Sequence, residues 1–186
     1  MQLYIPNIPS NINDIVIFDV EYDGPLLVQL ASLILSRTTE PNIFALAKSF
    51  NVYVDVGRPL TSFFTRYTNI TNEFLCDNGV DLSVARSLVK EHLLDIDVNN
   101  SMIVSHGVKN DLELLTQNNI DLKQIAVHYC TYDAAKKILR RNNRLSLKAV
   151  SLEGGYYMFN EHNAYADVWG TLYAFCRLKE LENASN

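Results

Sequence analysis

The chain has 186 residues, of which 48% are hydrophobic and 20% are charged, and its formal net charge is −5 at pH 7. This length and composition indicate one globular domain with a substantial core, and the negative charge argues against a protein that coats nucleic acid through bulk electrostatic attraction. No apolar run reaches the roughly 18 residues that span a bilayer, and the first residues resemble no secretory signal. We therefore expect an intracellular, cytoplasmic protein that enters no membrane.

The first half of the chain reads as strands followed by helices. Apolar runs separated by turn residues predict three strands, at residues 15–19, 26–36 and 50–56. Because the connections are short, we expect neighbouring strands to be antiparallel. Helices are predicted next at residues 59–67 and 81–94, and the apolar residues of the second helix recur on one face.

The second half of the chain alternates between strands and helices. Strands are predicted at residues 102–105 and 124–128, and helices at residues 108–116, 132–139, 146–152 and 164–181. This order predicts an α/β fold with a mixed five-stranded sheet flanked by helices on both faces. We expect residues 1–186 to form a single domain, with residues 1–13 as an N-terminal extension and residues 183–186 as a C-terminal tail.

Two carboxylates follow the first predicted strand in the segment IVIFDVEYDG. Asp19 and Glu21 are two residues apart, so they lie on the same face if the strand continues that far. Two adjacent carboxylates repel one another, and a divalent cation such as Mg²⁺ relieves that repulsion. The alternative is an exposed pair in a strand-end loop, because Asp-x-Glu is a common sequence.

Three further residues extend this pattern. Asp111 lies in the helix predicted after the strand at residues 102–105, and His162 and Asp167 lie near the start of the final helix. A separation of five residues corresponds to about 140° around a helix, so these last two residues cannot share a helical face. We therefore expect His162 in the loop before the helix and Asp167 in its first turns.

These motifs, in this order, resemble those of the DEDDh exonucleases of the ribonuclease H-like superfamily. That family includes bacterial polymerase proofreading subunits, ribonuclease T and oligoribonuclease, and the resemblance extends over residues 15–177. The segments FFTRYTNITNEFLCDNGV and VHYCTYDAAKKIL also resemble the corresponding stretches of the family. Two departures leave the substrate preference open. Many members have Thr-Thr-Gly after the first Glu, where this chain has YDG, and His-Asn before the second Asp, where it has SHGVKND.

The resemblance implies a metal-dependent 3′→5′ exonuclease that releases nucleoside 5′-monophosphates. It implies two Mg²⁺ ions, with Mn²⁺ able to substitute. Asp19, Glu21 and Asp167 would hold one ion, while Asp19 would also bridge to a second ion supported by Asp111. His162 would act as the general base that takes the proton of the attacking water.

Residues beside these motifs are candidates for substrate contacts. They are Val20, Tyr22, Tyr67 and His106. The two tyrosines are candidates for stacking on bases, and the alternative is that they are ordinary loop or core residues. The basic run at residues 136–144 would meet phosphates or complement a helix C-terminus.

The expected partner is the single-stranded 3′ end of RNA or DNA. A polymerase or other protein, and a second copy of the chain, are further candidate partners. Three roles of such an exonuclease stay open, namely RNA trimming or degradation, DNA proofreading and the removal of short oligonucleotides. We expect no polymerase domain in a chain of this length, so proofreading would have to act in trans. Two other functions remain open, namely a non-catalytic nucleic-acid or protein-binding module with an exonuclease fold and a small-nucleotide phosphodiesterase.

Overall fold

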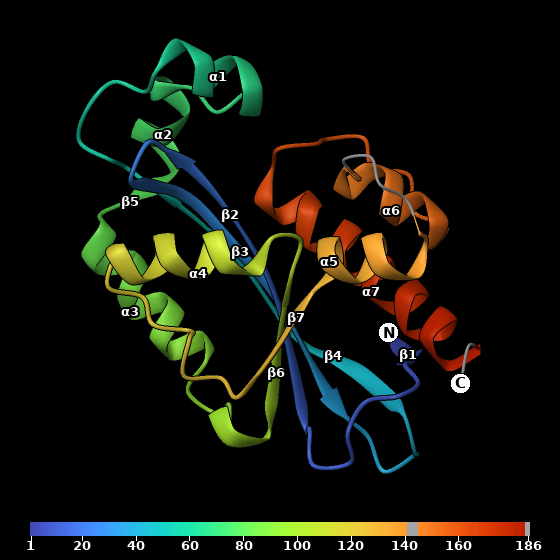
Figure 1. The fold of residues 1–186 in the computed structure, drawn as a ribbon. Coiled ribbons are helices and arrows are strands. Elements are labelled where there is room, and N and C mark those ends of the chain that lie inside the picture. Colours follow the sequence, from blue (N-terminus) through green and yellow to red (C-terminus); the bar gives the residue numbers. More distant parts are fainter. Residues whose placement is uncertain (141–144, 185–186) are drawn as a thin grey trace.

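A single mixed sheet lies at the centre of the computed structural model, which describes residues 1–140 and 145–184 (Figure 1). The strand order along the sheet is β1-β4-β3-β2-β6-β7, and β5 pairs with β4 at one end of that strand. The strands are β1 (Gln2–Tyr4), β2 (Asp14–Asp23), β3 (Leu26–Arg37), β4 (Ile43–Val54), β5 (Gly79–Val80), β6 (Ser101–Ser105) and β7 (Val127–Cys130).

Helices cover both faces of this sheet, as the sequence predicts. In Figure 1, α3 and α4 lie on one side of the strands and α5, α6 and α7 lie on the other, while α1 and α2 lie near the end of β2. The helices are α1 (Ser62–Thr68), α2 (Asn72–Asn78), α3 (Leu82–His92), the 3-10 helix η1 (Val98–Asn100), α4 (Val108–Gln117), α5 (Thr131–Ile138), α6 (Leu147–Glu153) and α7 (Ala164–Ala184). None of these helices combines the length and apolarity that crossing a membrane requires.

The central strand β2 explains why two cores form. Its apolar residues alternate between the faces of the sheet, so Val16 and Phe18 pack with α3 and α4, while Ile15 and Ile17 pack with α7. All four side chains are fully buried. A strand that is buried on both faces reads as a continuous apolar run, which is the reason that IVIF was recognisable in the sequence.

The pairing of the strands agrees with the predicted mixed sheet. β2, β3 and β4 are antiparallel neighbours joined by short turns. β6 pairs parallel with β2, and β7 pairs parallel with β6. The carboxyl ends of β2, β6 and β7 therefore meet at one edge of the sheet, where open α/β sheets bind their ligands.

The sheet of the described residues has seven strands, so the predicted number of five was wrong. β1 arises from residues expected to extend from the domain, and Ile5, Ile8 and Ile12 of that region are at most 6% exposed in the core beside α7. Their spacing of three and four residues matches a helical period, but the intervening prolines at positions 6 and 9 oppose a helix, so the sequence pattern did not reveal their burial. β5 has only two residues, too few to form a pattern.

Element boundaries differ from the predictions in three places. β4 begins at Ile43, whereas the sequence predicted a start at residue 50. The first half of this strand is only partly buried, and its apolar and polar residues do not alternate cleanly, so no strand pattern was visible there. β7 begins at Val127, since the preceding residues form turns in which the Ile125 N–H donates to the Leu122 carbonyl. The helix α2 was not predicted. At the C-terminus, α7 continues into the expected tail as far as Ala184, and residues 185–186 lie outside the described residues.

Candidate active site

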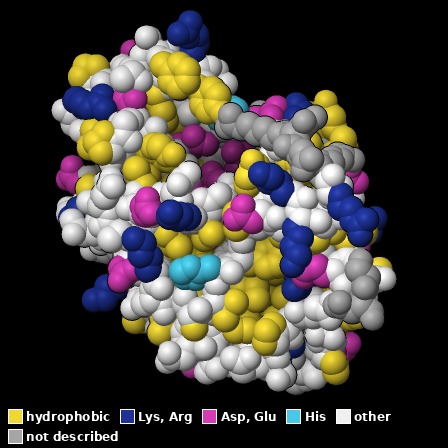
Figure 2. Space-filling view, viewed as in Figure 1, with side chains coloured by type: hydrophobic (Ala, Val, Ile, Leu, Met, Phe, Trp, Pro, Cys, Tyr) yellow, Lys and Arg dark blue, Asp and Glu magenta, His cyan; other side chains and the backbone are white. Residues whose placement is uncertain are grey.

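All nine residues singled out in the sequence line one cleft of about 910 Å³ at the carboxyl ends of β2 and β6. Figure 2 shows a hollow with acidic side chains on its floor and hydrophobic side chains beside it. The nine are the expected catalytic residues Asp19, Glu21, Asp111, His162 and Asp167 and the expected substrate contacts Val20, Tyr22, Tyr67 and His106.

Asp19 is the carboxylate on which the other three acidic groups converge. Burial raises its pKa well above the usual value, and the negative charges of Asp167, Asp111 and Glu21 raise it further. Asp19 lies in the regular part of β2, opposite Ala31 of β3, and a bulge follows between Glu21 and Tyr22. The strand therefore continues through both carboxylates, as the interpretation of Asp-x-Glu requires, and they do not form an exposed pair in a loop.

The other three carboxyl groups share this environment. Burial, followed by the charges of Asp167 and Asp111, raises the pKa of Glu21 to about 8. Burial also raises the pKa of Asp167 to about 7. Asp111, near the start of α4, has its pKa raised to about 6 by burial, although it accepts a hydrogen bond from the Ser105 hydroxyl at the end of β6. Four carboxyl groups that disfavour each other's ionisation form a cluster that a cation would stabilise.

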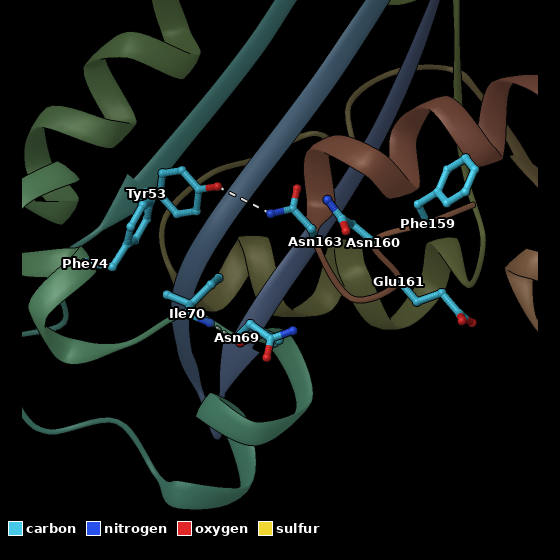
Figure 3. A pocket seen from close by; sticks show the side chains of 9 residues that line it. Tyr53, Asn69, Ile70, Phe74, Phe159, Asn160, Glu161 and Asn163 are labelled. Carbon is cyan, nitrogen blue, oxygen red and sulfur yellow. Dashed lines mark hydrogen bonds between the residues drawn. The ribbon is translucent and has the colours of Figure 1, made fainter. Parts of the chain in front are cut away.

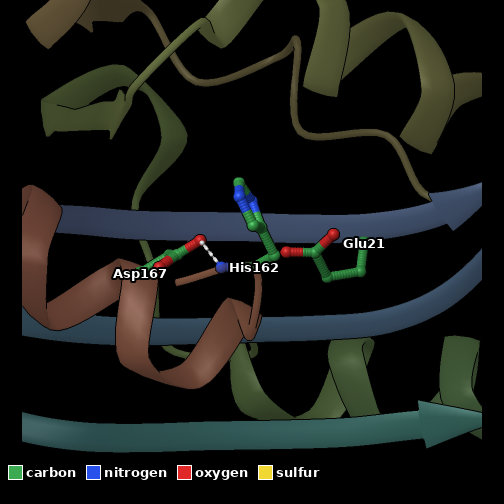
Figure 4. A group of neighbouring side chains, drawn as sticks. All are labelled: Glu21, His162 and Asp167. Carbon is green, nitrogen blue, oxygen red and sulfur yellow. Dashed lines mark hydrogen bonds between the residues drawn. The ribbon is translucent and has the colours of Figure 1, made fainter. Parts of the chain in front are cut away.

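The donor set fits a divalent cation. Ligand atoms of Glu21, His162 and Asp167 lie within 4.8 Å of one another, and the two carboxylates point toward His162 from opposite sides (Figure 4). The Oδ1 atom of Asp167 is buried and has no hydrogen-bond partner among the described residues, as expected for an oxygen that binds a metal ion. Carboxylate oxygens are the ligands that Mg²⁺ and Mn²⁺ prefer.

His162 lies in the loop before α7, as predicted from its five-residue separation from Asp167. Its backbone is in the left-handed region, with φ of 63°, and its N–H donates to Oδ2 of Asp167 at 3.2 Å. The imidazole stacks on the ring of Tyr67, with ring centroids 3.6 Å apart and an angle of 24° between the planes. Burial lowers the pKa of His162, against a smaller opposing effect of Glu161, so the ring is neutral at pH 7 and able to accept a proton.

A family model described as an exonuclease model, RNase_T, matches residues 16–175. The chain belongs to this exonuclease family. The resemblance inferred from the three motifs is thereby confirmed, and the matched residues include the whole acidic cluster and His162.

Individual proteins also resemble this exonuclease-family chain, with sequence identities below 30%. The DNA polymerase III PolC-type of Latilactobacillus sakei subsp. sakei (strain 23K) is 28% identical over 175 residues, covering 92% of this chain but 12% of the polymerase. E. coli Exonuclease I in complex with a dT13 oligonucleotide superposes with a TM-score of 0.68 at 16% identity, covering 93% of this chain and 42% of that one. Exonuclease X in complex with 5′ overhanging duplex DNA gives a TM-score of 0.60 at 18% identity and covers 92% of both chains. At these identities the structural likeness supports the fold.

The predicted substrate contacts occupy different positions in the cleft. Tyr22 is 41% exposed at the end of β2 and is accessible to a ligand. His106 also lines the cleft, but both of its ring nitrogens lie within hydrogen-bonding distance of scaffold atoms, the Thr131 hydroxyl at 2.9 Å and the Leu145 carbonyl at 3.2 Å. Phe63, which the sequence did not single out, is 69% exposed in the same cleft. Of the basic run, residues 141–144 lie outside the described residues.

A second hollow, of about 410 Å³, adjoins the cleft (Figure 3). Tyr53 and Phe74 lie on one side of it and Asn163 lies on the other, and the Asn163 amide donates to the Tyr53 hydroxyl at 3.4 Å. The Oδ1 atom of Asn163 accepts from the N–H groups of Tyr165 and Ala166, which caps α7. This hollow therefore contains the anchor of the loop that carries His162.

Asp23 is a buried carboxylate at the end of β2 that sequence reasoning missed. Its side chain is bonded by the N–H of Thr61 at 2.9 Å, the Thr61 hydroxyl at 2.6 Å and the Arg58 guanidinium at 3.0 Å. Burial acts to raise its pKa, but these hydrogen bonds and the charge of Arg58 lower it below the usual value. Asp23 is thus a structural acid that joins β2 to the N-terminus of α1.

We expect Asp23→Ala to reduce the free energy of unfolding by about 2–4 kcal/mol, because the change removes the three hydrogen bonds that Thr61 and Arg58 donate to this buried carboxylate. Urea denaturation would measure the loss. Asp77→Ala is the matched control, since Asp77 is exposed in α2 and should change stability little. Equal stability of Asp23→Ala and wild type would show that this network does not hold α1 on β2.

Stability without metal should fall as the pH rises. The carboxyls of Glu21, Asp111 and Asp167 have higher pKa values in the folded protein than their usual values, so protonation favours the folded state. This contribution is complete below about pH 4, the usual carboxyl pKa, and is lost as the pH rises through about 6 to 8. In EDTA we expect a loss on the order of 2 kcal/mol, or about 4–8 °C in Tm.

Thermal unfolding between pH 5 and 8.5, in EDTA and in Mg²⁺, would measure this effect. Mg²⁺ should restore the Tm at pH 8, because a bound cation replaces the protons that the cluster has lost. A Tm in EDTA that increases from pH 5.5 to pH 8 would contradict the electrostatic interpretation of the cluster.

Proposed function

We propose that this chain is a divalent-metal-dependent 3′→5′ exonuclease of the DEDDh type, with residues 1–186 acting as one exonuclease domain. One observation carries the proposal: four carboxyl groups from β2, α4 and α7 share one cleft with a histidine of lowered pKa. Membership in the exonuclease family supports the same reaction class.

In this proposal Asp19, Glu21 and Asp167 hold one Mg²⁺ or Mn²⁺, and Asp19 and Asp111 hold a second. Bound cations supply Lewis acidity and lower the pKa of a coordinated water. His162 accepts the proton of the attacking water through its neutral imidazole. Ser105 orients the Asp111 carboxylate through its hydrogen bond, and the His162 N–H orients that of Asp167.

The proposed substrate is the 3′ end of a single strand of DNA or RNA. E. coli Exonuclease I, whose fold is similar, was solved with a dT13 oligonucleotide and also as a complex with single-stranded DNA. A polymerase partner is suggested by the PolC-type relative, of which this chain spans 12%. Association with a second copy of the chain is a further prediction, which analytical ultracentrifugation would test.

Hydrolysis of a 5′-labelled strand tests the proposal. The protein would be incubated with single-stranded DNA and RNA of equal length in Mg²⁺, Mn²⁺ or EDTA. We expect a ladder that shortens from the 3′ end in either metal and is absent in EDTA, with nucleoside 5′-monophosphate as the released product. Cleavage of small nucleotides alone would favour a phosphodiesterase, and binding without any cleavage would favour a non-catalytic module.

A further inference from the structure

We infer that Tyr67 is a positioning residue for His162, and this inference rests on the proposed function. The imidazole of the proposed base lies against the Tyr67 ring at a centroid distance of 3.6 Å. Tyr67 stacks in turn near Phe63, with centroids 5.7 Å apart and an angle of 14° between the planes. The three rings form a column that ends on His162.

Two of the three rings in the column, those of Phe63 and Tyr67, come from α1. Phe63 and Tyr67 are four residues apart, so successive turns of the helix place their side chains on the same face. Both side chains line the cleft and are well exposed, at 69% and 48% respectively. Their burial in a core therefore does not explain why these rings are aligned.

The backbone of His162 is fixed more firmly than its ring. Its N–H is bonded to Asp167, and the next residue, Asn163, caps α7 and bonds to Tyr53. The side chain of Gln29 on β3 adds to this anchor by accepting from the Ala164 N–H at 3.1 Å. The imidazole itself lies against the Tyr67 ring, and this stack limits its rotation. In Figure 4 the ring projects away from α7.

The helix α1 is tied to the strand that carries the acidic cluster. Thr61 caps α1 by accepting from the Phe64 N–H, and the same Thr61 donates to Asp23 at the end of β2. Asp19, Glu21 and Asp23 lie on one strand. The column therefore transmits the position of β2 to His162, which aligns the proposed base with the carboxylates across the cleft.

The same geometry restricts another role for Tyr67. With His162 at 3.6 Å, no space remains for a base between the two rings. The Phe63 ring lies nearly parallel to the same Tyr67 ring, with centroids 5.7 Å apart. Stacking of a substrate base on Tyr67 would require the column to open. If Tyr67 bound a base in this way, removing its ring would weaken substrate binding. If the closed column blocked the cleft, removing the ring would increase the rate.

Kinetics of Tyr67→Leu and Tyr67→Phe would separate these roles. On a single-stranded oligonucleotide with saturating Mg²⁺, we expect Tyr67→Leu to lower kcat about 10- to 100-fold with little change in KM, because the base loses its alignment. Tyr67→Phe keeps the ring and should keep most of the rate. Tyr4→Leu is the control, since Tyr4 is a similarly exposed tyrosine on β1, away from the cleft.

A second measurement needs neither metal nor substrate. The chain has four histidines, so a carbon–proton spectrum resolves their imidazole signals, and the His162→Gln variant assigns that of His162. Stacking on Tyr67 should shift this signal upfield in the metal-free protein. The shift should disappear in Tyr67→Leu and persist in Tyr67→Phe and Tyr4→Leu.

Three results would overturn the inference. An increase in KM alone for Tyr67→Leu would indicate a substrate contact, and an increase in rate would indicate that Tyr67 blocks the cleft. An unchanged His162 signal in Tyr67→Leu would show that the rings do not stack. A wild-type protein without hydrolytic activity would overturn the proposed function itself, and that result is seen before any variant is compared.

Discussion

Replacing Asp19 by asparagine is expected to lower kcat/KM by at least about 10³-fold while leaving the fold intact. The substitution keeps the size of the side chain but removes the charge on which the other three carboxyl groups converge. Since both proposed cation positions share Asp19, this single change affects both. Initial rates on a 5′-labelled single strand would measure the loss.

Asp19→Asn should also change the thermal stability, and in the opposite direction to its effect on activity. In EDTA at pH 8 the variant should have a higher Tm than wild type, because a buried source of repulsion is gone. Asp14→Asn is the matched control, since Asp14 lies at the other end of β2, where it accepts from the Ser36 hydroxyl at 2.6 Å. It should keep the wild-type rate. A folded Asp19→Asn variant with the wild-type rate would refute the assignment of the site.

His162→Gln is expected to lower kcat by about 10²- to 10⁴-fold, the usual contribution of a general base. The wild-type rate should rise with pH as His162 loses its proton and then level off, with the rise below the usual histidine range because burial lowers the pKa of this ring. The variant should lose this dependence. Single-turnover rates between pH 5 and 8 would measure both effects.

The control for this variant is His128→Gln, because His128 is exposed on β7 away from the cleft. Its rate and pH profile should match those of wild type. If His162→Gln kept the wild-type rate and pH profile, a different group would have to be the base, and the role proposed for Tyr67 would fail as well.

The sequence predicted the parts of the site that depend on local spacing. Asp19 and Glu21 follow a run of apolar residues that forms a doubly buried strand, so their shared face could be inferred from the period of two. The five-residue separation of His162 and Asp167 placed one in a loop and the other in a helix, and the structure agrees. These inferences needed no contact between distant segments.

The parts that sequence reasoning missed depend on distant contacts. Asp23 continues the alternation of Asp19 and Glu21, but the bulge after Glu21 and the partners Thr61 and Arg58 give it a structural role. The stack of Tyr67 on His162 joins residues 95 positions apart in the numbering, and no local pattern reports it. Burial of the N-terminal isoleucines likewise depends on α7, at the other end of the chain.

Titration with Mn²⁺ by calorimetry tests most directly the central claim, that the acidic cluster exists to bind a divalent cation. At pH 7 we predict saturable binding that releases protons and strengthens toward pH 8, because binding requires carboxylates whose pKa values are about 6 to 8. Asp19→Asn should bind far more weakly, and Asp14→Asn should bind as wild type does. No binding to the wild-type protein, or equal binding to Asp19→Asn, would contradict the account.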